Sequence, residues 1–209
     1  MKLLLFVLIG LTIRNTETRG QSIEQLLTPK IATLETARGA DNLQRLANDF
    51  ERIALAHPKN WHAQYYTAYA YTVLAFQLPK GKIDATCDRA VEYLDKAVGI
   101  RPKEVENYVL MAYLLSARIN VNPMFRGASM GSQSKEHLNK AFELAPDNPR
   151  AYYVRGMGIF RTPAAFGGGK KKARPYLDKA METFNTLKDV SPLDPRWGKN
   201  ETAQLLAEY

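Results

Sequence analysis

A short glycine and serine motif at residues 127–131 is the first place where the sequence could support catalysis. Gly127, Ser129 and Gly131 match the G-x-S-x-G pattern, in which a sharp turn from a strand into a helix exposes a nucleophilic serine. That chemistry needs a strand before the turn and a histidine that follows an acidic residue. The histidine downstream of the motif, His137, instead precedes Asp147. We therefore expect no enzyme, and we interpret the motif as a glycine-rich loop with positive φ.

A run of glycines and lysines at residues 166–172 is a second candidate site. Phe166 is followed by three glycines and then by Lys170, Lys171 and Lys172. Glycine amides and a lysine at the start of a helix favour binding of an anion. The G-x-x-x-x-G-K-[ST] spacing of nucleotide-binding loops is absent, and no strand precedes the run. The sequence therefore predicts a flexible turn followed by solvated lysines.

The histidines and the cysteine do not have the spacing of a metal site. His57, His62 and His137 share no ligand spacing, and no H-E-x-x-H motif is present. Cys87 is the single cysteine, so it cannot form an internal disulfide, and we expect it to be a small, partly buried apolar residue. We predict neither a metal nor a cofactor.

The composition is that of an ordinary globular protein. The chain has 209 residues, of which 45% are hydrophobic and 24% charged, which excludes disordered, collagenous and polytopic membrane proteins. Lysine and arginine outnumber aspartate and glutamate by 29 to 21, and this excess favours anionic partners. No recognised nucleic-acid-binding module is present, and we expect no nucleic-acid partner.

The N-terminus has the pattern of a secretory signal peptide. Lys2 precedes an uncharged run from Leu3 to Ile13, and a polar stretch then leads to Gly20 and Gln21. The run is too short to span a bilayer as a helix, and no cysteine stands near the expected cut to carry a lipid. We predict a signal peptide at residues 1–20 and an exported protein, periplasmic or secreted. An uncleaved anchor is the alternative.

The rest of the chain is a repeat. Prolines stand at positions 58, 102 and 146, so two successive intervals of 44 residues are equal. The string Tyr93–Ala97 returns as His137–Ala141 and again as Tyr176–Ala180. Each period holds two segments with the apolar spacing of amphipathic helices, and a proline follows the second segment as a helix stop. The sequence predicts an all-α fold, an α-solenoid of antiparallel helical hairpins.

This pattern resembles the tetratricopeptide repeat, whose 34-residue hairpin carries small, large, alanine and proline residues in a fixed order. The resemblance implies about four units in residues 21–192, with residues 193–209 as a C-terminal capping segment. HEAT and armadillo arrays have similar periods, but the order of residue types favours the tetratricopeptide repeat. The last unit begins at Tyr152 and Gly156 and leaves two registers open for its second helix. The residues that carry the match in the middle units are Gln64, Ala68, Ala90, Leu94, Ala97 and Pro102, and then Tyr108, Ala112, Ser134, Leu138, Ala141 and Pro146.

Each unit is longer than the family's repeat, and the alignment places the extra residues between its two helices. These inserts are Phe76–Thr86, Arg118–Gln133 and Thr162–Ala173. All three join a first helix to a second helix, so they should emerge on one edge of the solenoid. This basic edge is a candidate surface for anionic lipid or polysaccharide. Its cations are Lys80, Lys82, Arg126, Lys170, Lys171, Lys172 and Arg174.

The resemblance also implies a concave face lined by the first helix of each hairpin. Tyrosines dominate it, and tyrosine combines a large contact area with a hydroxyl group, as binding surfaces require. The alternative is that these tyrosines only pack between helices. Arg150 is the one cation of the stripe, so we expect an extended segment as ligand rather than a terminal carboxylate. The groove residues are His62, Tyr65, Tyr69, Thr72, Glu106, Val109, Tyr113, Ser116, Arg150, Tyr153, Met157 and Phe160.

Taken together, these patterns predict a non-enzymatic, exported interaction module that binds a protein or an extended peptide through the concave groove. An envelope-surface protein that docks through the basic edge is the first alternative. A serine hydrolase built on Ser129 is the second.

Overall fold

The computed structural model describes residues 21–188 and 191–209, and all the regular structure in these ranges is helical. This confirms the predicted all-α fold, whereas the predicted signal peptide at residues 1–20 lies outside the described ranges. No described helix has the length and apolar character needed to cross a bilayer. The helices are α1 (Ile23–Thr36), α2 (Ala40–Ala56), α3 (Trp61–Ala75), α4 (Lys80–Ile100), α5 (Val105–Ile119), α6 (Pro123–Leu144), α7 (Pro149–Arg161), the short 3-10 helix η1 (Ala164–Phe166), α8 (Lys170–Thr186) and α9 (Lys199–Ala207).

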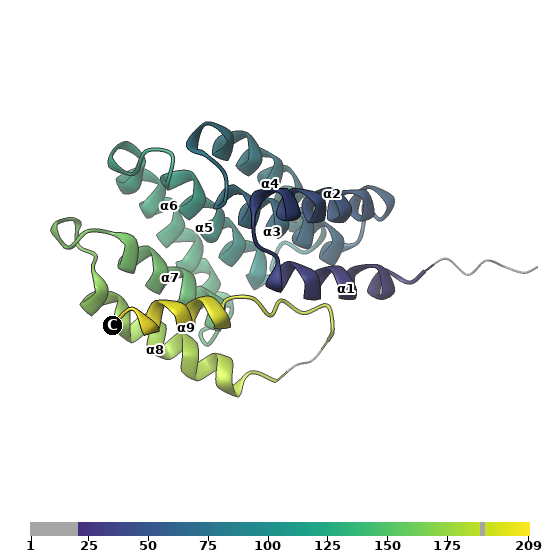
Figure 1. Cartoon of the computed structure of the whole chain (residues 1–209). Coiled ribbons are helices and arrows are strands. Elements are labelled where there is room, and N and C mark those ends of the chain that lie inside the picture. The colour runs from purple at the N-terminus through teal and green to yellow at the C-terminus, as the bar shows by residue number, and fades with distance from the viewer. Residues whose placement is uncertain (1–20, 189–190) are drawn as a thin grey trace, which may run out of the picture.

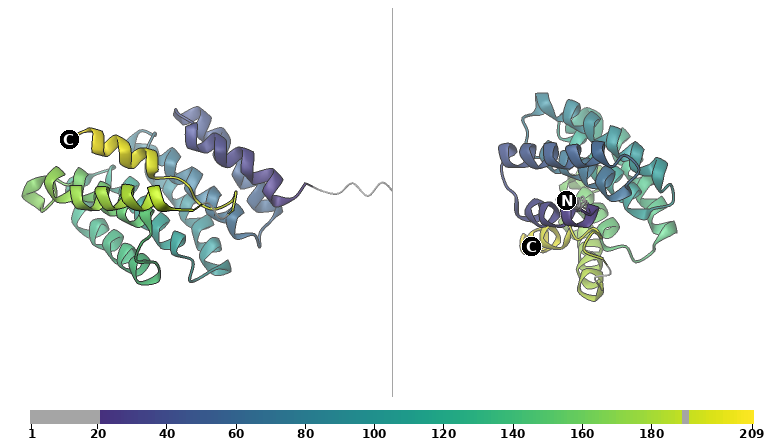
Figure 2. Two further views of the ribbon diagram at one scale, coloured as in Figure 1. Left: turned by 90° about the horizontal axis from the view of Figure 1, so that it is seen from below. Right: turned by 90° about the vertical axis from the view of Figure 1, so that its right-hand side faces the viewer.

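The helices form a stack of antiparallel hairpins (Figure 1). The hairpins α3/α4, α5/α6 and α7/α8 are the most extensive pairings, and α1/α2 precedes them. The first helices α1, α3, α5 and α7 contact one another in order along the stack. After α8 the chain turns back, and α9 packs against α7 and α8 (Figure 2). The result is a helical repeat whose last helix folds back over the preceding hairpin.

Asparagine side chains start three of the helices. Asn60, Asn122 and Asn148 each accept a hydrogen bond from the backbone amide three residues later, at 3.0, 3.4 and 3.0 Å. An N-cap of this kind satisfies an amide that has no partner inside the helix. Helix α2 begins after Gly39, which has φ +83°, and Asp41 lies within its first turn.

The interior of each hairpin follows one pattern, which settles the register of the last repeat. Ala90, Leu94 and Ala97 of α4 are fully buried. In α8 the equivalent residues Ala173, Leu177 and Ala180 are also fully buried, whereas Leu187 is 46% exposed. The last hairpin therefore follows the register set by the Tyr176–Ala180 string. The alternative register through Leu187 does not occur.

Most of the first two inserts lengthen helices rather than form loops. Helix α4 begins at Lys80 and has 21 residues, and α6 begins at Pro123 and has 22 residues. The G-x-S-x-G motif therefore lies inside α6, and neither Gly127 nor Gly131 has positive φ. Our interpretation of the motif as a loop was wrong, because the helix continues through both glycines.

The glycine run before α8 forms a defined turn. Gly167 and Gly169 have φ of +87° and +104°, a region that favours glycine. A Cβ atom on Gly168 would lie 2.2 Å from the carbonyl oxygen of Thr162. The amide of Gly169 donates a hydrogen bond to the carbonyl of Ile159 at 2.9 Å. The predicted turn is present, and its own hydrogen bonds hold it against the end of α7.

Two glycines of α7 provide a test of hairpin packing. A Cβ atom on Gly156 would lie 2.7 Å from Cδ2 of Leu177, whereas one on Gly158 would meet no atom within 4 Å. We expect Gly156→Ala to lower the free energy of unfolding by about 1–3 kcal/mol through overpacking. Gly158→Ala should raise it by up to about 1 kcal/mol, because alanine favours the helix. Urea unfolding of both variants measures this, and equal effects would contradict the close packing at Gly156.

Candidate functional site

Four tyrosines of the predicted concave groove surround Trp197, which lies just before α9. The Trp197 ring stacks on Tyr69 and Tyr113, with centroid distances of 5.0 and 5.2 Å. Tyr153 meets its ring edge-on at 6.2 Å, and the indole Nε1 donates a hydrogen bond to the Tyr65 hydroxyl at 2.9 Å. The groove residues are therefore brought together as predicted by their spacing, but around a side chain of the same protein.

The segment at residues 193–198 follows the concave face and covers it. The Tyr66 hydroxyl donates a hydrogen bond to the carbonyl of Leu193 at 3.0 Å, and Nη1 of Arg150 donates one to the carbonyl of Pro195 at 2.7 Å. Gly198, at φ +102°, then turns the chain into α9. We expected this segment to cap the end of the stack, and it also fills the groove.

An ion pair lies beneath this segment. Arg150 donates hydrogen bonds from Nε and Nη2 to the two carboxylate oxygens of Glu106, at 2.8 and 2.7 Å. The side chains of Asn148 and Tyr65 donate further hydrogen bonds to the same carboxylate, at 2.6 and 3.5 Å. Both charged side chains are less than a tenth exposed. Each predicted groove charge thus has its partner within the protein.

The other groove residues also have partners on this face. Val109 is fully buried, and the sulfur of Met157 accepts a hydrogen bond from the Tyr153 hydroxyl at 3.5 Å. The half-buried ring of His62 packs edge-on against Trp61 at 4.9 Å, and burial lowers its pKa. Burial raises the pKa of Tyr65 and Tyr153 well above the usual value, so these hydroxyls stay protonated at neutral pH.

The predicted basic edge contains both paired and unpaired cations. Arg126 makes a two-pronged contact with Asp84, at 2.7 and 2.8 Å, and Nε of Arg174 contacts Asp178 at 2.8 Å. Lys170 donates a hydrogen bond to a backbone carbonyl near the C-terminus. The remaining cations make no ion pair within the described ranges, and all are exposed; they are Lys80, Lys82, Lys171 and Lys172.

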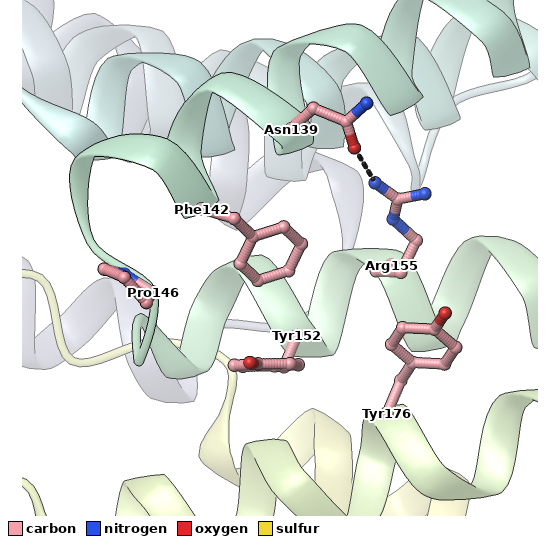
Figure 3. Close-up of a pocket in the computed structure, with 6 residues that line it drawn as sticks. All are labelled: Asn139, Phe142, Pro146, Tyr152, Arg155 and Tyr176. Carbon is pink, nitrogen blue, oxygen red and sulfur yellow. Dashed lines mark hydrogen bonds between the residues drawn. The ribbon is translucent and has the colours of Figure 1, made fainter.

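An open pocket of about 390 Å³ lies between the last two hairpins, and none of its lining residues belongs to the predicted groove, so we call it the outer pocket (Figure 3). The rings of Phe142 and Tyr152 pack against each other in its lining, with centroids 4.8 Å apart and planes tilted by 53°. Helix α6, helix α7 and helix α8 each contribute side chains, so the pocket exists only when the hairpins are stacked. Its lining residues are Asn139, Phe142, Pro146, Tyr152, Arg155 and Tyr176.

Arg155 is the charged residue of this pocket. Its Nη2 donates hydrogen bonds to Oδ1 of Asn139 at 2.7 Å and to the carbonyl of Lys135 at 3.4 Å. Its Nε is buried without a hydrogen-bond partner, and no acidic group pairs with it in the described residues. Burial lowers the pKa of the guanidinium, while nearby Tyr176 acts in the opposite direction. The guanidinium nevertheless remains charged at neutral pH, because its ordinary pKa is so high.

These features define a stack of helical hairpins with a self-filled inner face and an outer aromatic pocket. The chain is similar to the solved structure of the HusA haemophore from Porphyromonas gingivalis, with a TM-score of 0.82. The two sequences are 34% identical, and the match covers 91% of this chain and 94% of that chain. The chain therefore belongs to the family of this haemophore. No protein-family model and no curated protein matches it.

The packing of Trp197 can be tested by substitution. Its side chain is 5% exposed and contacts three hairpins. We expect Trp197→Ala to lower the free energy of unfolding by about 3–5 kcal/mol, as for other buried aromatic side chains. Trp197→Phe retains ring stacking and should lower the free energy of unfolding by less than Trp197→Ala does. Urea unfolding of both variants measures the difference, and an unchanged stability for Trp197→Ala would contradict a structural role for the segment.

Proposed function

We propose that this protein is a non-enzymatic carrier of haem or a related porphyrin, and that the outer pocket around Arg155 holds the ligand. Its family relationship to a haemophore supports a haem-type ligand. The single observation that carries the choice of pocket is the buried Nε of Arg155, which lacks a hydrogen-bond partner although the guanidinium lies 5.9 Å from the centroid of the partly buried Phe142 ring. Haem presents both a flat apolar ring and two carboxylates, so its chemistry complements these two features.

The guanidinium suits a propionate group of the porphyrin. A charged arginine beside no acidic side chain retains an unmet preference for an anion, and a carboxylate can accept hydrogen bonds from two of its nitrogens. Nη2 of Arg155 donates a hydrogen bond to Oδ1 of Asn139 at 2.7 Å, and this contact orients the guanidinium. The buried Nε has no partner and is the nitrogen that a ligand carboxylate would bind. Arg155 is partly buried and its Nε is covered, so a ligand carboxylate reaches this nitrogen only after the side chain shifts, which requires no change of fold.

The aromatic side chains suit the porphyrin ring. Phe142 and Tyr152 are partly buried, and Tyr176 is 36% exposed, so each keeps ring surface available to a ligand. Flat apolar ligands gain from contact with such rings. The lining residues include no histidine, cysteine or methionine, so Tyr152 and Tyr176 are the lining side chains that could ligate iron. Our proposal relies on ring contact and on Arg155 rather than on an iron ligand, and we expect metal-free protoporphyrin to bind as well as haemin does.

The test is a titration of the protein with haemin and with protoporphyrin, followed by the absorbance of the porphyrin. We expect Arg155→Ala to weaken the affinity for both ligands about tenfold, because a hydrogen-bonded charge contact is lost. Tyr152→Ala should weaken it by a similar factor through lost ring contact.

Arg161→Ala is the matched control, because Arg161 lies on the same helix with its side chain 65% exposed. Its affinity should equal that of the natural protein. Equal affinity of the natural protein and Arg155→Ala would place the porphyrin elsewhere on the protein. Absence of any binding would exclude the carrier role itself.

We also propose that the hairpins are of the tetratricopeptide type and that the protein is exported after cleavage near residue 20. The burial of Ala68, Ala90 and Leu94 at the expected positions supports the repeat type. The pattern of Lys2 and the apolar run after it supports export. Intact mass of protein recovered from the periplasm and the medium tests the cut, and mass of an uncut chain in the membrane fraction would contradict it.

A second candidate function is binding of a partner protein or peptide on the concave face. One observation favours it: the chain's own residues 193–198 lie along this face with two backbone carbonyls bound by side chains. We expect a labelled peptide of residues 191–198 to bind Trp197→Ala and not the natural protein, measured by fluorescence anisotropy. Failure to bind folded Trp197→Ala would contradict a peptide-binding role.

A further inference from the structure

Three large apolar side chains extend into solvent at the basic edge. Met124 is 83% exposed, Phe125 is 82% exposed and Phe166 is 75% exposed. Among the described residues these are the most exposed large hydrophobic side chains, and the next, Leu55, is 63% exposed. Neither the porphyrin pocket nor the concave face uses them. Large apolar side chains gathered on one edge, rather than scattered singly, mark a candidate interaction surface.

Local structure holds these side chains outward. Met124 and Phe125 lie in the first turn of α6, which Asn122 caps and Pro123 begins. Phe166 ends η1, and its amide donates a hydrogen bond to the carbonyl of Pro163 at 2.9 Å. Because both positions are built on hydrogen-bonded turns, the side chains are presented without rearrangement of the backbone.

The two turns belong to one edge of the molecule. The connections α3–α4, α5–α6 and α7–α8 follow one another along the upper left of the stack (Figure 1). Arg126 at the start of α6 forms an ion pair with Asp84 at the start of α4, at 2.7 Å. This ion pair joins the α3–α4 connection to the α5–α6 connection. This edge carries exposed apolar side chains on two of its three connections.

The charge of this edge is positive. Asp84 and Asp88 pair with Arg126 and Arg118, at 2.7 and 2.6 Å. These two acidic groups are thus neutralised by arginines. At the α7–α8 end, Asp178 pairs with Arg174 at 2.8 Å and Glu208 lies 3.8 Å from Arg161.

The lysines at the starts of α4 and α8 make no ion pair in the described ranges and are exposed. Lys172 donates a hydrogen bond to the carbonyl of Gly167 at 3.2 Å, and the other lysines remain available to an external anion: Lys80, Lys82 and Lys171.

We propose that this edge docks on an anionic lipid membrane, with Met124, Phe125 and Phe166 inserted at the headgroup level and the lysines on lipid phosphates. Lysines flanking exposed phenylalanine and methionine are the side chains by which proteins bind such interfaces. A soluble polyanion or an anionic polysaccharide would satisfy the lysines, but it offers no apolar layer for the three hydrophobic side chains. The proposal does not depend on porphyrin binding, because the outer pocket shares none of these residues.

The test is flotation of the full chain with vesicles of phosphatidylcholine alone or with one quarter phosphatidylglycerol. We expect binding to the anionic vesicles that weakens at high salt, because salt screens exposed charges. The double variant Met124→Ser/Phe125→Ser and the single variant Phe166→Ser should each bind about tenfold more weakly, through loss of inserted apolar surface. The triple variant Lys80→Gln/Lys82→Gln/Lys171→Gln should lose the preference for anionic vesicles.

Leu55→Ser is the matched control, because Leu55 is exposed but lies on α2, outside the edge. It should bind as the natural protein does. All these variants share the same N-terminal segment, so a difference among them reports on the edge alone. Equal vesicle binding by the natural protein and Met124→Ser/Phe125→Ser would overturn the proposal. So would equal affinity of these two proteins for heparin together with no vesicle binding, which would identify a soluble polyanion instead.

Insertion has its own spectroscopic readout. Trp61 and Trp197 are 3% and 5% exposed, so their emission should not respond to vesicles. We expect the emission of Phe125→Trp to shift to the blue on addition of anionic vesicles, and that of Leu55→Trp to stay unchanged. An unchanged emission of Phe125→Trp bound to vesicles would also overturn the proposal.

Discussion

The inner side of the protein depends on the buried ion pair between Arg150 and Glu106. Two charges removed from water are unfavourable unless their hydrogen bonds are satisfied, and here the carboxylate contacts Arg150, Asn148 and Tyr65. The guanidinium also needs the carbonyl of Pro195, which it binds at 2.7 Å. The charge pair therefore holds the C-terminal segment in the groove, and this segment brings Trp197 between the tyrosines. Because this segment fills the groove, the pocket around Arg155 and the basic edge are the candidate binding surfaces that remain open.

The repeat could be predicted from the sequence because the prolines and the small residues keep one spacing. The small residues Ala68, Ala112 and Gly156 stand 44 residues apart, and each is buried against the second helix of its hairpin. The last register could not be predicted, because Leu138 and Leu177 are only 39 residues apart. The shortening falls in the second helix, because α8 has 17 residues and α6 has 22, while the glycine turn before α8 is longer than the connection before α6.

The site was predicted less well than the fold, for a physical reason. Helical spacing identified which tyrosines share a face, since that depends on neighbours three and four residues away. It did not indicate that Trp197 would cover them, because Tyr65 and Trp197 are 132 residues apart in the chain. The role of Arg155 could not be predicted for the same reason. On one helix it resembles a solvated arginine, and only the stacking of α6 and α8 beside it creates the pocket.

The return of the chain across the inner face also changes how the protein unfolds. A simple repeat stack is nearly one-dimensional, so its end units can open while the others persist. Here Tyr66 binds Leu193 and Tyr65 binds Trp197, so the second hairpin is joined directly to the C-terminal segment. Opening the last hairpin therefore disrupts contacts of α3, α5 and α7 together. The segment thus couples the last three hairpins, so that opening of the C-terminal end is linked to loss of contacts in all three.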